Sequence, residues 1–197
     1  MKILITSFGP FAEFKENPSN VVMQMLQQQM KSLEVNHELT FDTLEVSYKA
    51  VDLFEKEYEN SNYDLVIHLG VATNDNILRF EVRARNERSG KDVLGKTPER
   101  KEIAQDMADL ETNLSQSQLT EFCSRHPGIT RISSDAGTYL CNYIYYNSLF
   151  YLRSKTKVLF IHIADFFNRP DAPTAMVQTE IIFELISELE NVESLES

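Results

Sequence analysis

The sequence predicts an α/β fold: one domain, residues 1–197, in which a mainly parallel mixed sheet lies between two layers of helices. Short apolar runs typical of buried strands alternate along the chain with longer segments of helical periodicity. No Pro-, Gly- or Ser-rich linker and no internal repeat divides the 197 residues. Hydrophobic residues make up 42% and charged residues 25% of the chain, which is typical of a globular protein with one sizeable core.

Clear boundary signals frame the elements of the N-terminal half. KILITSF (2–8) is an apolar run that predicts a buried strand, and a loop with two prolines follows it. Asn17 and Pro18 form an N-cap and first-turn pair for a helix that extends to about Leu33. The next expected elements are a half-exposed strand at 37–46, an amphipathic helix at 47–60 capped by Ser47, and a buried strand at 64–70 that closes on Gly70 and opens into a loop.

Strands and helices also alternate in the C-terminal half, after one irregular segment. ILRFEVRARNE (77–87) is compatible with a further strand, and residues 87–112 are polar with little periodicity, which predicts a long surface excursion. The elements expected after it are a short helix at 117–126, a strand at 128–134, an aromatic-rich helix at 139–152, a buried strand at 157–164 and a last helix at 172–190 opened by Pro173. Open sheets of this kind bind ligands at the carboxyl ends of their strands.

Charge and composition narrow the class of partner. The formal net charge of -11 repels phosphate backbones and anionic lipid heads, so neither nucleic acid nor a membrane surface is expected as a partner, and a small or peptidic one fits better. The N-terminal apolar stretch is too short for a signal sequence, and no run approaches the length of a membrane span. Two cysteines without a disulfide framework indicate a reducing compartment, and we therefore expect a cytoplasmic protein.

Several common cofactor motifs are missing from the sequence. It has no GxGxxG after a strand, no phosphate-binding loop of the Walker type, and no His, Cys and carboxylate cluster at metal-ligand spacing. We therefore expect neither a cofactor nor a metal.

The stretch DAGTYLCN (135–142) places Cys141 where a helix should begin, just after a glycine turn. The unpaired N–H groups and the positive dipole end of that helix would lower the pKa of the thiol and supply donors for an oxyanion. A buried structural cysteine is the commoner alternative, and spacing alone leaves the two interpretations about even. Cys123, in an amphipathic helix beside Phe122, is expected to pack in the core.

A cysteine nucleophile needs a base, and His162 is the best placed of four histidines, near the carboxyl end of VLFIHIA. A capped histidine at a strand end is its structural alternative. His68 lies inside an apolar strand and is expected to be a hydrogen-bonded core residue, whereas His37 and His126 lie in polar turns and are expected to be solvated.

The imidazole also needs an acid to orient it, and Glu81 has apolar neighbours that could shield it from water. Asp135 and Asp165 are close alternatives, and most of the 30 acidic residues are expected on solvated faces. Residues that meet only in space cannot be chosen by sequence spacing.

Four blocks, in order and at compatible separations, resemble the pyroglutamyl peptidase I family, cysteine peptidases that remove N-terminal pyroglutamate. ITSFGPFAEFKENPS is similar to the family's N-terminal TGFxPFGGxxxNPS signature, and DAGTYLCNYIYYNSL to the segment around its nucleophile. LFIHIA resembles the strand that bears the family's histidine, and EVRARN the segment that starts with its glutamate. The resemblance covers nearly the whole chain.

The resemblance implies roles for individual residues. It aligns Cys141 with the nucleophile, His162 with the base and Glu81 with the residue that orients it. For substrate binding it implies that Phe8 and Phe11 flank the lactam ring, and that Asn17 fixes the loop or contacts the substrate. It also implies N-terminally pyroglutamylated peptides as partners, and an assembly that is either monomeric or a homo-oligomer.

The chain departs from the family pattern at three points near these blocks, the first being Ala12-Glu13 in place of a Gly-Gly pair. Val71 stands where many bacterial members have a glutamine that holds the pyroglutamyl group, although animal-type members also read Gly-Val there. We therefore expect backbone groups near Gly70 and Val71 to bind the lactam. Val82 replaces the arginine of the bacterial Glu-Arg pair, which leaves Arg83 or Arg85 as substitutes.

Two other functions compete with this interpretation. One is a ligand-binding homologue with weak or lost turnover, and the other is a hydrolase of another small lactam or amide. The combination of Cys141, His162 and Glu81 argues against a pure binding protein, which has no chemical need for all three.

Overall fold

The computed structural model describes residues 1–11, 15–32 and 38–196. Within this part of the chain the strands are β1 Lys2–Phe8, β2 Glu38–Leu44, β3 Leu65–Ala72, β4 Leu78–Glu81, β5 Arg83–Ala84, β6 Leu110–Glu111, β7 Thr130–Ser133 and β8 Lys157–Ala164. The helices are α1 Pro18–Ser32, α2 Tyr48–Tyr58, α3 Gln116–Arg125, α4 Leu140–Leu152 and α5 Ala175–Glu196.

The main sheet has the strand order β2-β1-β3-β8-β4-β7. Strands β2, β1, β3 and β8 are mutually parallel, whereas β4 pairs with β8 in antiparallel orientation and with β7 in parallel orientation. Strands β5 and β6 form a separate antiparallel ribbon. The prediction of a mainly parallel mixed sheet is confirmed.

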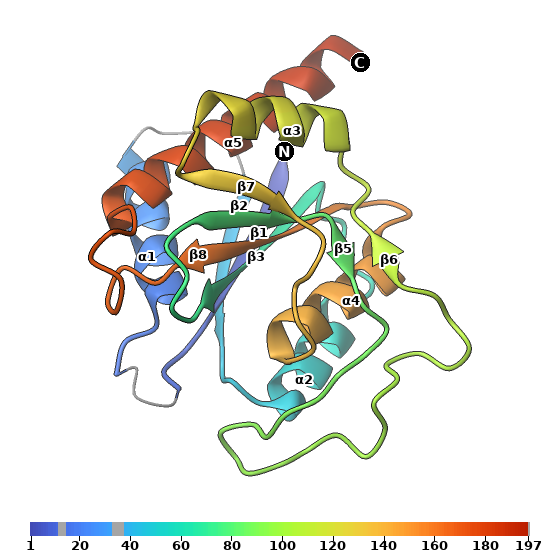
Figure 1. The fold of residues 1–197 in the computed structure, drawn as a ribbon. Coiled ribbons are helices and arrows are strands. Elements are labelled where there is room, and N and C mark those ends of the chain that lie inside the picture. Colours follow the sequence, from blue (N-terminus) through green and yellow to red (C-terminus); the bar gives the residue numbers. More distant parts are fainter. Residues whose placement is uncertain (12–14, 33–37, 197) are drawn as a thin grey trace.

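Helices cover both faces of the main sheet, which makes three layers (Figure 1). Because neighbouring residues of a strand point to opposite faces, β1 contributes Ile3 and Ile5 to one core and Leu4 to the other. The first core is closed by α1, α3 and α5, and the second by α2 and α4. Burial on both faces explains why β1, β3 and β8 are continuous apolar runs.

Two predicted helix caps are present, and one predicted helix start is wrong. The Oδ1 atom of Asn17 accepts from the backbone N–H of Ser19 at 3.0 Å, and the Oγ atom of Ser47 accepts from that of Ala50 at 3.1 Å. The last helix begins at Ala175 and not at Pro173. Thr174 lies at its start, because its Oγ1 atom accepts from the N–H of Val177 at 3.4 Å.

Two other boundaries differ from the prediction, and one cannot be compared with it. Strand β3 does not close on Gly70 but continues through Val71 to Ala72, because β8 pairs with it along its whole length. The segment 77–87 contains two short strands, β4 and β5, in different sheets. The predicted end of the first helix at Leu33 lies outside the described residues, as does His37.

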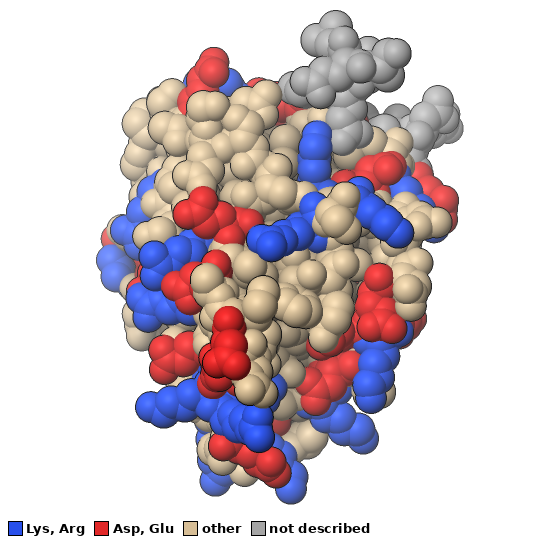
Figure 2. Space-filling view, turned by 90° about the vertical axis from the view of Figure 1, so that its right-hand side faces the viewer, with Lys and Arg blue, Asp and Glu red and all other residues tan. Residues whose placement is uncertain are grey.

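In the part of the chain that the structure describes, no helix has the length and apolar composition needed to cross a bilayer. The face in Figure 2 carries acidic and basic side chains side by side, without a broad area of one sign.

Candidate active site

A cavity of about 340 Å³ opens where β1, β3 and β8 reach their carboxyl ends and α4 begins. Its lining residues come from five regions that are far apart in the sequence: Phe8, Phe11, Asn17, Val46, Val71, Ala72, Thr73, Arg79, Asp135, Ala136, Gly137, Thr138, Tyr139, Leu140, Cys141 and His162. The cavity therefore lies at the edge of the sheet where ligands were expected.

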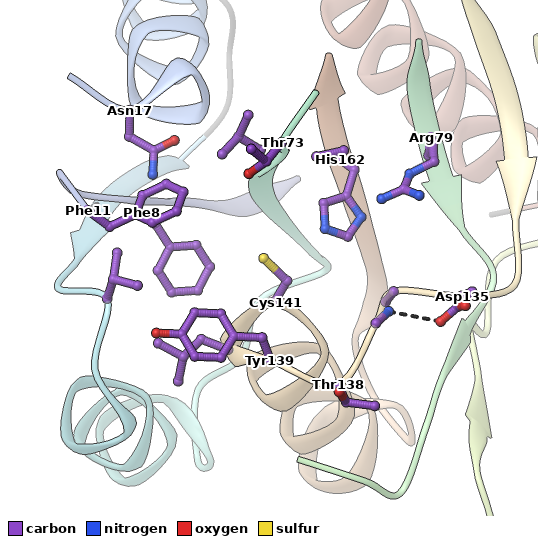
Figure 3. Close-up of a pocket in the computed structure, with 16 residues that line it drawn as sticks. Phe8, Phe11, Asn17, Thr73, Arg79, Asp135, Thr138, Tyr139, Cys141 and His162 are labelled. Carbon is purple, nitrogen blue, oxygen red and sulfur yellow. Dashed lines mark hydrogen bonds between the residues drawn. The ribbon is translucent and has the colours of Figure 1, made fainter. Parts of the chain in front are cut away.

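Cys141 is the second residue of α4, and its thiol points into the cavity (Figure 3). Tyr139 is the N-cap residue, and its side chain makes no capping hydrogen bond to the first turn. The N–H groups of that turn therefore remain available as donors beside the thiol. Asp135 supports the preceding turn, because its Oδ1 atom accepts from the N–H of Gly137 at 3.0 Å, and Gly137 has a φ of 80°.

Gly70 allows the thiol to approach β3 closely. A Cβ atom at this position would lie 2.8 Å from Cys141 Sγ and 2.7 Å from Cζ of Phe160. Val71 lines the cavity, but Gly70 does not. The missing side chain of Gly70 gives the thiol its space beside β3, and the binding of the lactam by backbone groups near Gly70 and Val71 stays a prediction.

His162 and Glu81 form a buried hydrogen-bonded pair. His162 Nδ1 lies 2.7 Å from Glu81 Oε1, and the two side chains are 5% and 0% exposed. A carboxylate can only accept, so Nδ1–H donates and Nε2 carries the free lone pair. The register places Gly70 and Arg79 on either side of His162, on β3 and β4.

The two alternative acids are engaged elsewhere. Asp165 is buried, but its Oδ2 atom accepts from the N–H of Asn74 at 3.0 Å and its Oδ1 atom from the N–H of Asn168 at 3.2 Å. Asp135 lines the cavity and lies 3.1 Å from Arg85 Nη2, with its side chain 57% exposed. Of the three candidate acids, Glu81 is the one that contacts His162.

Arg79 is a cavity residue that the sequence analysis missed. Its Nε atom lies 3.4 Å from Glu81 Oε1 and 3.7 Å from Asp75 Oδ2. The expected substitutes lie elsewhere: Arg83 pairs with Asp109 at 3.0 Å, and Arg85 pairs with Asp135. The sequence signal that could have identified Arg79 is the two-residue period of a strand, which puts residues 79 and 81 on the same face of β4.

The pKa values of the cysteine and histidine favour neutral side chains. Burial raises the pKa of the Cys141 thiol to about 12, with a further increase from the charge of Glu81. Arg79 and the backbone N–H of Cys141 oppose that increase. Burial also lowers the pKa of His162, against the contrary influence of Glu81. The backbone N–H at the helix start therefore lowers the pKa of the thiol, in the predicted direction, but desolvation is the larger effect and the net pKa is raised.

The end of the cavity that lies away from Arg79 is aromatic. Phe8, Phe11 and Tyr139 line it, and in Figure 3 they lie on the far side of Cys141 from Arg79. Asn17 also lines this end, and its Nδ2 atom donates to the carbonyl of Gly9 at 3.0 Å. Because the same side chain caps α1, Asn17 links Gly9, just after β1, to this helix.

The polar excursion at 87–112 holds the segment that precedes Cys141. Ser89 N donates to the carbonyl of Thr138 at 2.6 Å, and the hydroxyl of Tyr139 donates to the carbonyl of Lys91 at 2.9 Å. Asn142 Nδ2 donates to the carbonyls of Arg85 and Glu87. The excursion is thus part of the cavity's support, and sequence periodicity could not reveal this.

His68, His126 and Cys123 lie away from the cavity. His68 is bonded to two hydroxyl groups in the core, as predicted. Cys123 is buried in the core formed with α1, α3 and α5, also as predicted. His126 is not solvated as expected: its ring packs on Phe122 with centroids 4.9 Å apart. Among the described residues, no group of three or more His, Cys, Asp or Glu side chains is placed to hold a metal ion.

Comparisons with known proteins relate the chain to one family. The family model described as pyroglutamyl peptidase matches residues 1–181. A pyrrolidone-carboxylate peptidase of Lactobacillus acidophilus is 31% identical over 171 residues, which cover 83% of each chain. The pyrrolidone carboxyl peptidase of Thermus thermophilus superposes with a TM-score of 0.78 at 27% identity, covering 92% of this chain and 96% of its own. That of Fervidobacterium islandicum superposes with a TM-score of 0.83 at 24% identity, covering 97% and 99%.

Proposed function

The chain belongs to the pyroglutamyl peptidase family, and we propose that it is a cysteine exopeptidase that removes N-terminal pyroglutamate from peptides. In this proposal Cys141 is the nucleophile, His162 the general base and Glu81 the residue that orients His162. The observation that carries it is the 2.7 Å bond between His162 and Glu81, beside the cavity into which the Cys141 thiol points. Residues 1–197 then act as one catalytic domain.

Acylation begins from the neutral pair. His162 Nε2 takes the proton of the Cys141 thiol as Sγ attacks the carbonyl carbon of the pyroglutamyl residue. The negative charge that develops on the carbonyl oxygen is stabilised by the N–H groups of the first turn of α4. The carboxylate of Glu81 stabilises the imidazolium that forms and keeps Nδ1 as the donor.

Release of the amine and hydrolysis follow from the same groups. The imidazolium of His162 gives its proton to the departing nitrogen as the C–N bond breaks, and the pyroglutamyl group remains as a thioester on Sγ. His162 then deprotonates a water molecule, which attacks the thioester. Pyroglutamate leaves, and the thiol of Cys141 recovers its proton.

The aromatic end of the cavity is suited to an uncharged lactam. Phe8 and Phe11 offer flat faces for the ring, and Val71 adds an apolar wall. With valine at position 71, the N–H and C=O of the ring are bound by backbone groups near that residue and by Asn17. Tyr139, held by the excursion, closes the wall on the α4 side.

The partners in this proposal are pyroglutamylated peptides, and the site of action is the cytoplasm. A ligand-binding homologue without turnover is not favoured, because a binding site gains nothing from a buried carboxylate bonded to a histidine beside a thiol.

The substrate is tested with two fluorogenic amides, pyroglutamyl and prolyl. The prolyl analogue lacks the lactam oxygen, so the buried donor of the site that would bond to this oxygen is left unpaired. It also carries a charged amine. We expect the pyroglutamyl amide to be cut on the order of a hundredfold better, and Phe11→Ala to lower kcat/KM for it. Cys141→Ser is the control for contaminating activity. Equal cleavage of both amides, abolished in Cys141→Ser, would retain the peptidase chemistry but contradict pyroglutamate as the substrate.

A further inference from the structure

The two ends of the cavity differ in chemistry, and Cys141 lies between them (Figure 3). Phe8, Phe11 and Tyr139 line one end, and His162, Arg79 and Asp135 line the other. If the lactam occupies the aromatic end, as in the function proposed above, the leaving peptide lies on the side of His162, because this residue protonates the departing amine.

The guanidinium of Arg79 lies beside His162, and neighbouring residues leave its hydrogen-bond donors unused. Arg79 and His162 are register partners on β4 and β8. The buried Nε atom of Arg79 lies within ion-pair distance of Glu81 and Asp75 but makes no hydrogen bond, and no hydrogen bond joins the rest of the Arg79 side chain to any described residue. The side chain is 21% exposed, and it lines the cavity. The exposed donors of Arg79 are therefore open to a bound molecule.

Each nearby carboxylate accepts a hydrogen bond or ion pair from a donor other than Arg79, although Glu81 Oε2 has no hydrogen-bond partner of its own. Glu81 Oε1 accepts the short bond from His162, and Asp75 Oδ2 accepts from Arg131 Nη2 at 2.9 Å. Asp135, the other acid at this end, is paired with Arg85 and with the N–H of Gly137. Arg79 is thus the cation of this end whose hydrogen-bonding capacity is left for the substrate.

We propose that Arg79 binds a carboxylate of the leaving group and makes the enzyme selective for anionic groups in the residue after pyroglutamate. In a pyroglutamyl dipeptide, the terminal carboxylate is attached to the same carbon as the amine that His162 protonates. A guanidinium next to the imidazole is placed to bind that carboxylate, and its planar set of N–H donors matches the two carboxylate oxygens. An acidic side chain at the same position presents the same chemistry.

The test compares matched neutral and anionic substrates by kcat/KM. One pair is pyroglutamyl-alanine and its amide, and the second is pyroglutamyl-aspartate amide and pyroglutamyl-asparagine amide. The basicity of the leaving amine differs within a pair, so the diagnostic quantity is the change in the anionic-to-neutral ratio on mutation. The first pair reports a terminal carboxylate and the second a side-chain carboxylate.

Arg79→Gln should lower the ratio about tenfold in at least one pair, and Arg79→Lys should retain part of the preference. Arg131→Gln is the matched control, because Arg131 is the register partner of Arg79 on β7 and also approaches Asp75, but does not line the cavity. This variant should keep the wild-type ratio. Added salt should weaken the wild-type preference for the anionic substrate.

Equal losses for anionic and neutral substrates in Arg79→Gln would overturn the proposal, because Arg79 would then act only by positioning Glu81. Wild-type kcat/KM for both substrates in Arg79→Gln would also overturn it, because Arg79 would then contribute nothing to binding the leaving group. Failure of the proposed function is a separate result: the wild-type enzyme would cut no pyroglutamyl substrate at all, and both proposals would fall.

Discussion

Strands β3 and β8 each bury one histidine, and the surroundings of these two residues differ in two respects. His68 bonds to the hydroxyls of Thr6 and Ser148, at 2.7 and 2.8 Å, and is fully buried. His162 bonds to the carboxylate of Glu81 and lines a cavity. Neutral hydroxyls stabilise an imidazolium less than a carboxylate does, and burial lowers the pKa of His68 to about 3.

The comparison shows what separates a structural histidine from one that can transfer protons. Burial and hydrogen bonding are common to both residues, so neither property identifies a base. A charged partner on one ring nitrogen and access to a ligand on the other distinguish His162. Gly70, two residues after His68 on β3, adds the space in which the thiol approaches.

The largest expected effect is the loss of activity in His162→Gln, which is compared with the same exchange at His68. His162→Gln removes the base and should lower kcat/KM on the order of a thousandfold or more. His68→Gln, assayed where it is folded, should stay within a few-fold of wild type, because His68 does not reach the cavity. Comparable losses in the two folded variants would break the distinction between the regions.

Removing the charge of Glu81 should have a smaller effect. Glu81→Gln can still bond to the ring but cannot stabilise the imidazolium by charge, so we expect a loss of kcat on the order of a hundredfold. KM should change little, because Glu81 does not line the cavity. Circular dichroism controls for folding. Activity near wild type would mean that the charge of the partner does not set His162 apart from His68.

Gly70→Ala tests the steric part of the comparison. The added methyl group would lie 2.8 Å from Cys141 Sγ and 2.7 Å from the ring of Phe160, so one of them must move. We expect kcat/KM to fall about tenfold or more, since small misplacements at a reacting centre are costly. Unimpaired turnover with a stable fold would show that the approach of the thiol to β3 is unimportant.

The histidine environment should also be visible in stability. The pKa of His68 is lowered from 6.5 to about 3, so the unfolded chain binds the extra proton between these values and stability falls as the pH falls. The contribution of His68 to the free energy of unfolding should drop by about 2 kcal/mol from pH 7 to pH 5. Urea titrations give the free energy of unfolding of wild type and His68→Gln at both pH values. The contribution of His68 is the difference between the two proteins in how much this free energy changes from pH 7 to pH 5. Parallel pH dependence in the two proteins would contradict the buried neutral state of His68.

Much of this architecture is predictable from the sequence because local signals and tertiary packing agree. The apolar runs of β1, β3 and β8 are buried on both faces, and the capping residues Asn17 and Ser47 bond as their chemistry predicts. Glu81 was only one of three plausible acids on sequence chemistry alone, because its bond to His162 spans 81 residues. The family resemblance supplied that choice.

Other features depend on contacts between distant segments. The excursion at 87–112 has no periodicity, yet it holds Thr138 and Tyr139 through backbone and side-chain hydrogen bonds. The net rise in the pKa of the Cys141 thiol was not predicted, because a helix start is visible in the sequence, whereas desolvation by the surrounding side chains is not. Arg79 was within reach of sequence analysis, since it shares a strand face with Glu81.

The central claim is that Cys141, and not Cys123, carries the reaction, and alkylation tests it most directly. Cys141 lines the cavity and Cys123 is buried in the core, so iodoacetamide should label Cys141 first, faster as the pH rises because its pKa is raised. Peptide mass mapping and pyroglutamyl amidase assays on the same samples should show activity falling in proportion to the label on Cys141, and Cys141→Ala should be inactive. Full activity with Cys141 completely alkylated, or wild-type turnover by Cys141→Ala, would contradict the account.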